Sequence, residues 1–418
     1  MLRKLYLILL CFISLAGVAP CFAHAQTLDF QASKAAFIRD GDLWTRIQGK
    51  EKRITQSGHV HSPQWSSDGQ WIAYLEDVKP PKMTNDLWVY NVTTTQKRRI
   101  FQDAKNPHWH PIKPLLAFQG GHELSGLLNV SNLQSFNNVA LGVDDFIWYP
   151  DGRSFLLESS ATLRPDGWTN SILYKKNFHS LSEMNRLSDA KRFFIIPKTV
   201  DLHGEENLAI GADSFSFSPS SKWLSFIVYP TASLSMDSNM LCLLSKDGKT
   251  FKVLDEVIRD IGQPKWAPSK DTLGFIAGGG RLVFGYSNKK LKVQETSRSL
   301  TLTPKKKADL NFTWVNHRTL VTSRVDEQDW TLSPNPVLVN IKLPGRKQTQ
   351  ITHPPKAEGD YNPHYLNKSH SLVWLRSPNI YLKHADVWTA HADGSKAKRW
   401  ISNVSDIAVY ETDNMNMN

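Results

Sequence analysis

The sequence is poor in cysteine, in long apolar runs and in dense blocks of charge. Its 418 residues include three cysteines, Cys11, Cys21 and Cys242, which excludes a scaffold held together by disulfides. After residue 18 no segment approaches the roughly 18 consecutive apolar residues of a membrane-spanning helix. The 50 basic residues outnumber the 39 acidic ones but are scattered in short groups, which favours solvated strand edges over a specific nucleic-acid interface.

The first 25 residues have the pattern of a secretory signal peptide. Arg3 and Lys4 precede an apolar run over residues 5–18, and the segment ends in the small-x-small sequence Ala23-His24-Ala25. We therefore expect cleavage before Gln26 and export of the chain, either to a periplasm or out of the cell. No transmembrane segment is expected after cleavage, and Cys242 alone would remain, so the mature chain could form no intramolecular disulfide.

One motif recurs seven times along the rest of the chain. Each copy carries an aromatic residue near the end of a short strand, in strings such as Ser62-Pro63-Gln64-Trp65 and Asn106-Pro107-His108-Trp109. A turn and an apolar strand follow each copy, and a period of this length indicates a propeller or a linear array. A large flat side chain suits the wedge between two neighbouring sheets. The recurring aromatic residues are Trp65, Trp109, Trp148, Phe217, Trp266, Trp314 and Tyr365.

Four strands can be assigned to most of the repeated units, which predicts an all-β fold, a β-propeller of four-stranded antiparallel blades. Residues 35–55 contain three strands without an inner strand before them, and residues 406–410 form an inner strand with nothing after it. Pairing of this C-terminal strand with the N-terminal blade would close the ring. Eight blades result, or seven if one weak unit is an elaboration. We expect a single propeller domain over residues 26–411 and a flexible tail over 412–418.

The strands of two units are assigned as follows. After Trp148 the outer strand is placed at residues 183–187, and residues 191–212 are expected to be a long connection to the next blade. After Trp266 the third and fourth strands are placed at residues 281–286 and 291–294.

The repeat also has a recognisable sequence. Pro63-x-Trp65-Ser66-x-Asp68-Gly69, followed by Trp71-Ile72-Ala73-Tyr74 and by Asp86-Leu87-Trp88-Val89-Tyr90, resembles the repeat of TolB-like (WD40-like) propellers. The resemblance is strongest in residues 62–100, 145–158, 214–254 and 361–401. It implies a stand-alone exported propeller that binds a protein or a component of the cell envelope.

The motifs of several enzyme classes are missing. The repeat is also similar to the propeller half of dipeptidyl-peptidases, but the sequence contains no Gly-x-Ser-x-Gly nucleophile elbow, no Gly-x-Gly-x-x-Gly and no phosphate-binding loop. A non-catalytic, monomeric binding protein without a cofactor is therefore the first hypothesis. The alternative is an exported carbohydrate-active enzyme of lyase type, or a lectin, with a metal held in the channel by His108, His110 and His364. Against that alternative, His108 and His110 are expected to be solvated channel residues.

Loop lengths indicate where a partner would bind. Connections from the second to the third strand of a unit, and from the fourth strand to the next unit, emerge on the same side of a propeller, which we call the long-loop face because several of them are long. The other connections are short. Binding residues concentrate on loops held by a rigid scaffold, and exposed aromatic and charged side chains supply much of the energy of an interface. The predicted partner-binding residues are Trp168, Trp330, Arg164, Asp166, Asp326 and Glu327; both Trp side chains could instead fold back onto their own loops.

Overall fold

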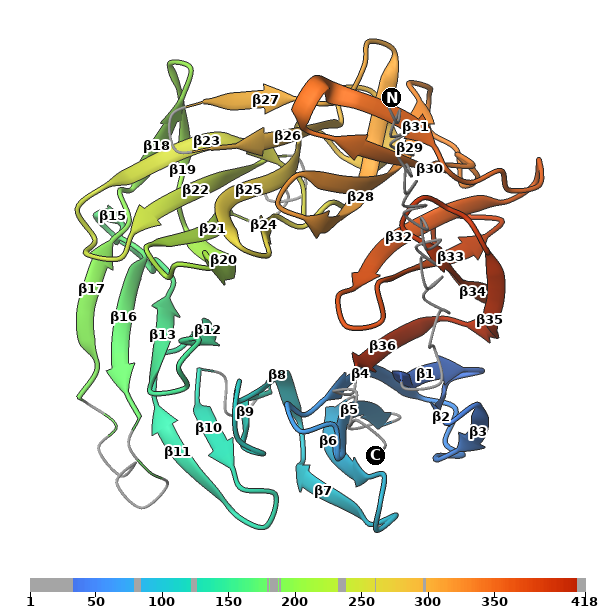
Figure 1. Ribbon diagram of the computed structural model, residues 1–418. Helices are drawn as coiled ribbons and strands as arrows, with labels where there is room; N and C mark the ends of the chain where they lie inside the picture. Colours follow the sequence, from blue (N-terminus) through green and yellow to red (C-terminus); the bar gives the residue numbers. More distant parts are fainter. Residues whose placement is uncertain are drawn as a thin grey trace, which may run out of the picture.

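The chain forms a ring of eight four-stranded antiparallel sheets around a central channel (Figure 1). The computed structural model describes residues 33–78, 84–121, 126–178, 180, 187, 189–231, 238–259, 261–295 and 298–411. The predicted signal peptide and the predicted tail lie outside these residues. The predicted fold class is confirmed, with eight blades.

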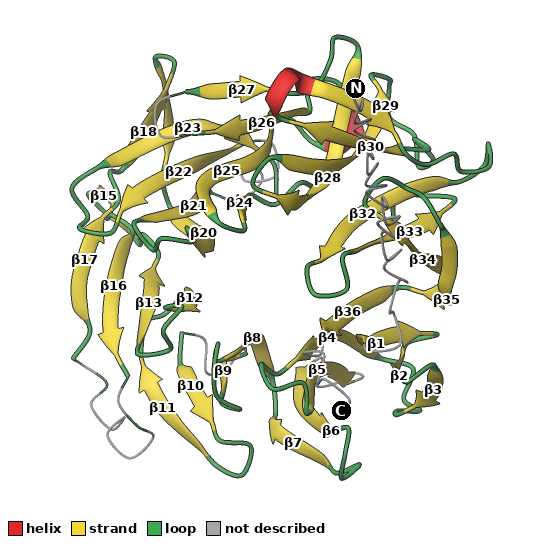
Figure 2. Cartoon of the chain, viewed as in Figure 1, coloured by secondary structure: helices red, strands yellow, loops and turns green. Residues whose placement is uncertain are grey.

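In each blade the first strand lies nearest the channel and the fourth lies outermost (Figure 2). In the first half of the ring, the strands from inside to outside are: blade 1, β36 (Asp406–Glu411), β1 (Ser33–Arg39), β2 (Asp42–Ile47) and β3 (Lys50–Arg53); blade 2, β4 (Val60–Trp65), β5 (Trp71–Val78), β6 (Thr84–Asn91) and β7 (Lys97–Phe101); blade 3, β8 (Ala104–Trp109), β9 (Leu116–Gly120), β10 (Leu128–Ser131) and β11 (Phe136–Ala140); blade 4, β12 (Asp145–Trp148), β13 (Ser154–Ser159), β16 (Ile172–Asn177) and β17 (Lys191–Ile195).

The second half continues the same order. Its strands are: blade 5, β20 (Gly211–Phe217), β21 (Trp223–Tyr229), β22 (Asn239–Ser245) and β23 (Phe251–Val257); blade 6, β24 (Lys265–Ala267), β25 (Lys270–Ala277), β26 (Lys290–Gln294) and β27 (Ser299–Thr301); blade 7, β28 (Lys307–Asn316), β29 (Thr319–Asp326), β30 (Val337–Lys342) and β31 (Lys347–Gln350); blade 8, β32 (Gly359–Leu366), β33 (Ser371–Ser377), β34 (Ala385–His391) and β35 (Lys398–Val404). Two hairpins and two short 3-10 segments complete the described elements: β14 (Leu163–Arg164) with β15 (Gly167–Trp168), β18 (Thr199–Leu202) with β19 (Glu205–Leu208), η4 (Leu282–Phe284) and η5 (Pro344–Arg346).

The two ends of the described chain close the ring, as predicted. Strand β36 pairs antiparallel with β1 over the register from Ser33 opposite Glu411 to Ile38 opposite Asp406. Blade 1 therefore takes its inner strand from the C-terminal end of the chain and its other three strands from the N-terminal end (Figure 1).

The recurring aromatic residues lie between neighbouring blades. Five indole N–H groups donate a hydrogen bond to a backbone carbonyl on the inner strand of the preceding blade: Trp65 to Ala408 (3.1 Å), Trp109 to Gln64 (3.1 Å), Trp148 to His108 (3.4 Å), Trp266 to Ser216 (3.1 Å) and Trp314 to Lys265 (2.8 Å). Phe217 has no such donor and packs on Tyr149 at 4.6 Å between ring centroids. The backbone N–H of Tyr365 donates to the hydroxyl of Thr313 in the preceding blade, at 3.1 Å. The five Trp rings and Phe217 thus pack in the cores between blades, and all of the seven residues except Phe217 make a hydrogen bond to the preceding blade.

Blades 4 and 6 differ from the predicted division into strands. The outer strand of blade 4 is β17, so the region expected to be only a connection contains that strand and the β18–β19 hairpin, and the third-to-fourth connection of this blade is long. Most of residues 183–187 lie outside the described part of the chain. In blade 6 the third strand is β26, and the residues expected to form it lie in the second-to-third connection. Buried Lys289 explains this, because its ammonium donates to the carbonyls of Gly278 (3.2 Å) and Gly280 (3.3 Å) and holds the segment out of the sheet.

Candidate functional site

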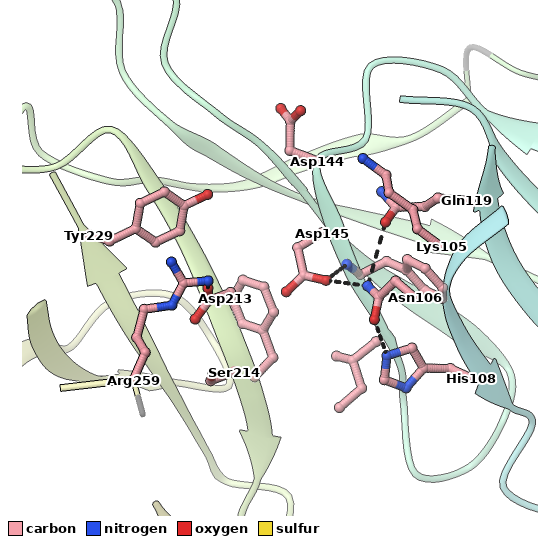
Figure 3. A pocket seen from close by; sticks show the side chains of 13 residues that line it. Lys105, Asn106, His108, Gln119, Asp144, Asp145, Asp213, Ser214, Tyr229 and Arg259 are labelled. Carbon is pink, nitrogen blue, oxygen red and sulfur yellow. Dashed lines mark hydrogen bonds and ion pairs between the residues drawn. The ribbon is translucent and has the colours of Figure 1, made fainter. Parts of the chain in front are cut away.

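A cavity of about 470 Å³ opens where the inner ends of blades 3, 4 and 5 meet (Figure 3). Its walls come from the starts of the inner strands β8, β12 and β20, from the ends of the second strands β9 and β21, and from the connection after β23. All of these chain ends lie on the long-loop face. We call the cavity the blade 3–5 pocket; its polar lining residues are Lys105, Asn106, His108, Gln119, Asp144, Asp145, Asp213, Ser214, Tyr229 and Arg259, and its apolar ones are Phe146, Ile147 and Phe215.

A recurrent irregularity of the inner strands directs side chains into this pocket. Asn106 and Ser214 have left-handed backbone conformations, with φ of 52° and 55°, and Ser62 and Asn362 repeat the feature at the matching positions of blades 2 and 8. The pairing of each inner strand with its second strand shifts register at this point. Such β-bulges bend a strand and re-aim its side chains, and asparagine tolerates the left-handed region better than most residues.

The Asn106 side chain uses this bulge to link blades 3 and 4. Its Nδ2 donates to Asp145 Oδ1 at 2.7 Å, and its Oδ1 lies 2.9 Å from His108 Nε2. An ionised carboxylate can only accept hydrogen bonds, so the amide nitrogen of Asn106 faces Asp145 and its amide oxygen faces the imidazole. Because that amide oxygen also only accepts, the proton of the His108 ring is on Nε2. Burial lowers the pKa of His108 to about 4. The imidazole is thus neutral at neutral pH, and its role in this chain of contacts is that of a donor to Asn106.

Acidic groups dominate the electrostatics around blade 4. Burial raises the pKa of Asp145 to about 6, and the neighbouring charge of Asp213 adds to the shift. Glu158, which is fully buried opposite Asp145 in the β12–β13 pairing, has its pKa raised to about 8 by burial and, to a smaller extent, by the charges of Asp144 and Asp145. The Glu158 carboxyl receives the hydroxyls of Ser171 (2.6 Å) and Ser160 (3.1 Å).

One basic side chain contacts this acidic group within the described residues. The Arg259 guanidinium forms an ion pair with Asp213 Oδ2 and lies 4.9 Å from the centroid of the Tyr229 ring. The other oxygen of Asp213, Oδ1, is buried and accepts no hydrogen bond. Burial is the main cause that raises the pKa of Asp213, and Arg259 opposes it. The pocket therefore contains more carboxylate than its own cations neutralise.

The structure places the predicted aromatic anchors outside this pocket. Trp168 belongs to β15, pairs with Leu163 and is half-buried. Arg164 and Asp166 are exposed in the same hairpin. Trp330 folds back, as the alternative prediction had it, and stacks on Tyr286 of blade 6 at 5.8 Å between ring centroids. These residues lie on the long-loop face of blades 4 and 7 but do not form one site.

The two acidic residues predicted beside Trp330 have partners within the fold. Asp326 pairs with Lys307 at 2.5 Å across the β28–β29 pairing, and Glu327 pairs with Lys290 of blade 6. Asp326 therefore links two strands of blade 7, and Glu327 links blade 7 to blade 6.

The structure does not bring the three histidines of the metal hypothesis together. His110 is 2% exposed and follows the end of β8, so the expectation of a solvated channel residue is wrong for it. Its Nδ1 accepts the backbone N–H groups of Ile112 and Lys113, both at 3.0 Å, and its Nε2 donates to the Gly152 carbonyl at 3.0 Å. His364 is exposed on β32 of blade 8. Among the described residues, no group of three or more His, Cys, Asp or Glu side chains is arranged to hold a metal ion.

The pocket carboxylates and Arg259 were missed because they are far apart in the sequence. A signal was present, since Asp144 and Asp145 begin the inner-strand motif of blade 4 and Asp213 begins that of blade 5. What the sequence does not contain is the position of Arg259, which reaches the pocket from the connection after β23.

None of the described helical segments is long and apolar enough to cross a membrane. No family model matches the chain. The Tol-Pal system protein TolB of Desulfosudis oleivorans is 32% identical over 105 residues, which span 22% of this chain and 23% of that protein.

Solved structures extend the similarity to most of the chain, at the level of the fold. The dihydro-heme d1 dehydrogenase NirN has a TM-score of 0.57 at 10% identity, over 90% of this chain and 75% of the other. Dipeptidyl peptidase 4 of Porphyromonas gingivalis has a TM-score of 0.55 at 9% identity, over 90% of this chain and 58% of the other. The chain is an eight-bladed β-propeller with a local sequence similarity to TolB.

Proposed function

We propose that this chain is an exported, non-catalytic propeller of the TolB-like type that binds a protein or a cell-envelope component through its long-loop face. The blade 3–5 pocket is the centre of the binding site. The observation that carries the proposal is this pocket itself, because it opens on the long-loop face and joins charged side chains from three blades around one cavity.

The contacts of the pocket residues favour binding over catalysis. His108 is the one imidazole among the described lining residues, and it bonds to an amide, not to a hydroxyl or a thiol. A nucleophilic mechanism would need a base within hydrogen-bond reach of such a group. The local similarity to TolB and the signal-peptide pattern of residues 1–25 support export.

Exposed apolar side chains also occur on the proposed face. Leu141 (62% exposed) lies in the connection from blade 3 to blade 4, and Leu163 (62% exposed) lies in the second-to-third connection of blade 4. The second-to-third connections of blades 6, 7 and 8 contain the exposed residues Val283, Leu332 and Tyr381. Apolar side chains on a scaffold of rigid loops are typical of protein-binding surfaces.

Site-directed photocrosslinking tests the face directly. A benzophenone amino acid would replace Leu163 on the long-loop face or, as the matched control, Ile112 in the first-to-second turn of blade 3 on the opposite face; these two side chains are 62% and 64% exposed. In an envelope extract of the producing organism, we expect discrete adducts from position 163 and none from position 112. Adducts from both positions alike, or from position 112 alone, would overturn the assignment of the face.

A further inference from the structure

We propose that the blade 3–5 pocket binds a primary ammonium group, such as the side chain of a lysine presented by the partner. The inference rests on the proposed binding function and names the chemistry that the pocket recognises.

The first argument is the absence of a cationic cross-strand partner at Asp145, compared with the buried aspartates of blades 7 and 8. Asp145 of β12 and Glu158 of β13 are direct cross-strand partners. In blades 7 and 8 a buried aspartate near the start of the inner strand has an arginine opposite it on the second strand: Asp309 faces Arg324, and Asp360 faces Arg376. Both arginines bind their aspartates, with Nε to Oδ1 distances of 2.8 and 2.7 Å.

Because burial raises the pKa of Glu158 to about 8, its carboxyl is protonated at neutral pH and supplies no positive charge to Asp145. Blade 4 thus leaves Asp145 without a cationic cross-strand partner, whereas Asp309 and Asp360 each have one. The shortage of positive charge at the blade 3–5 pocket is therefore a property of this site and not a requirement of the fold.

The second argument is the hydrogen bonding of the two aspartates that face the cavity. Asp145 Oδ1 accepts the Asn106 amide and the Phe146 N–H, whereas Oδ2 accepts no hydrogen bond from the described part of the chain. Asp213 Oδ2 is held by Arg259, and Asp213 Oδ1 is buried without a donor. A buried acceptor without a donor, such as Asp213 Oδ1, costs free energy. Asp145 lines the same cavity, so a ligand that donates to both carboxylates would be stabilised.

The geometry of these acceptors favours an ammonium over a guanidinium. Figure 3 shows Asp145 on one side of the pocket and Asp213 with Arg259 on the other, so that two separate carboxylates each offer one oxygen. A guanidinium binds best to both oxygens of one carboxylate, whereas the three donors of an ammonium can reach acceptors on different groups. Phe146, Ile147 and Phe215 line the same cavity and provide apolar contact for the methylene stem of a lysine.

Binding requires Asp145 in its ionised form. Its neighbours are Asp144 in the chain, Glu158 on β13, Asp213 on β20 and Arg259 after β23, and Asn106 connects it to His108 on β8. Because burial raises the pKa of Asp145 to about 6, affinity for the cation is expected to weaken as the pH falls through this value. A bound cation would in turn lower the pKa of Asp145.

The test uses the full mature chain and small probes, measured by NMR shift titration at pH 7.5. The probes are Nα-acetyl-lysine methylamide, its norleucine analogue, which has a similar stem without the charge, and its arginine analogue. We expect saturable binding of the lysine probe, with a Kd on the order of 1 to 10 mM, and at least about tenfold weaker binding of the other two. Absence of saturation with the lysine probe, or equal affinity for the norleucine or arginine probe, would overturn the inference.

Substitutions locate the binding within the molecule. Asp213→Asn and Asp145→Asn should each weaken binding of the lysine probe at least about tenfold, and Glu206→Gln, in the exposed β18–β19 hairpin, should leave it unchanged. If a pocket variant does not fold, the wild-type chain still tests the inference: saturating lysine probe should lower the pKa of Asp145 measured from its carboxyl carbon. An unchanged pKa, or an equal loss of binding in Glu206→Gln, would count against the pocket.

The photocrosslinking experiment separates this inference from the proposed function. Lysine-probe binding without adducts at position 163 would leave the pocket assignment standing and contradict the proposed partner. Adducts at position 163 without lysine-probe binding would leave the partner surface standing and contradict the ammonium site.

Discussion

The two halves of the long-loop face use similar residues in opposite ways. In blades 7 and 8 the buried aspartates Asp309 and Asp360 are each held by an arginine of the adjacent strand. In blades 4 and 5 Asp145 and Asp213 occupy starts of inner strands too, but Asp145 faces Glu158, and only Asp213 has a cation. A satisfied buried ion pair contributes to a fixed structure, whereas a buried carboxylate without a cation is costly to the fold. This contrast supports the proposal that the aspartates of blades 7 and 8 serve the structure and that the blade 3–5 pocket receives a ligand.

The connections between strands show the same contrast. On blades 6 to 8 they bond to one another: the Tyr286 hydroxyl donates to the Thr331 carbonyl at 2.6 Å, and the Ile380 N–H donates to the Leu332 carbonyl at 2.9 Å. Tyr286 and Tyr361 are buried there, with Trp330 packed against them. These contacts form a covered layer over the inner strands, while blades 3 to 5 leave a cavity at the corresponding place.

The largest expected effect comes from breaking a pair in the closed half. Arg324→Met would leave the fully buried carboxylate of Asp309 without its cation, so the free energy of unfolding should fall by about 3 to 5 kcal/mol. Urea denaturation measures this, and Arg164→Met, at an exposed position of β14, is the matched control with an expected change within about 0.5 kcal/mol. A loss below about 1 kcal/mol for Arg324→Met would mean that the pair does not hold blade 7.

Glu158→Gln should change how stability depends on pH. The folded-state pKa of Glu158 is raised to about 8 from an ordinary value of 4.5, so its contribution to stability is fully present below the ordinary value and is lost as the pH rises towards the raised one. The slope of this loss is about 1.4 kcal/mol per pH unit, and glutamine removes it. Denaturation at pH 5, 6.5 and 8 should show the free energy of unfolding of Glu158→Gln rising relative to that of the wild type at each step. Glu206→Gln, on the exposed β19, should follow the wild type. Parallel curves for Glu158→Gln and the wild type would contradict the raised pKa.

A matched pair of aspartate substitutions tests the contrast between the halves through its sign. At pH 7.5, Asp145→Asn removes a buried charge that has no cation, so stability should stay the same or rise by about 1 kcal/mol. Asp360→Asn leaves the Arg376 guanidinium without its partner, and stability should fall. Thermal melts of the two variants under the same conditions give the comparison; a fall of equal size in both would remove the distinction between a structural and a ligand-binding half.

The repeat made most of the fold predictable from the sequence. The aromatic that recurs near the end of seven inner strands, together with the composite blade at the ends of the chain, predicted eight blades, with seven as the alternative. The unpaired first and last segments predicted the closure of β36 on β1. Blade 6 was divided wrongly because the apolar stretch Leu282–Phe284 has the composition of a strand, whereas buried Lys289 ties the preceding glycines into a loop. That contact has no signature in composition or periodicity.

The pocket was less predictable for a physical reason. The face was expected from loop lengths, but exposed aromatic residues were taken as its anchors, and Trp330 packs on Tyr286 within the protein. The pocket depends on side chains from Lys105 to Arg259 that meet only when three blades are arranged around the channel. The charge of an aspartate can be read from the sequence, but the arginine or glutamate opposite it depends on strand register.

The most direct test of the account is a carbon-detected NMR titration of the carboxyl groups of Asp145 and Glu158 in the ligand-free mature chain. We expect half-titration of Asp145 near pH 6 and of Glu158 near pH 8, because burial raises the pKa of both carboxyl groups. Values for both groups at or below the ordinary 3.8 and 4.5 would show that these carboxylates are already solvated or paired, and the contrast between the two halves of the propeller would not hold.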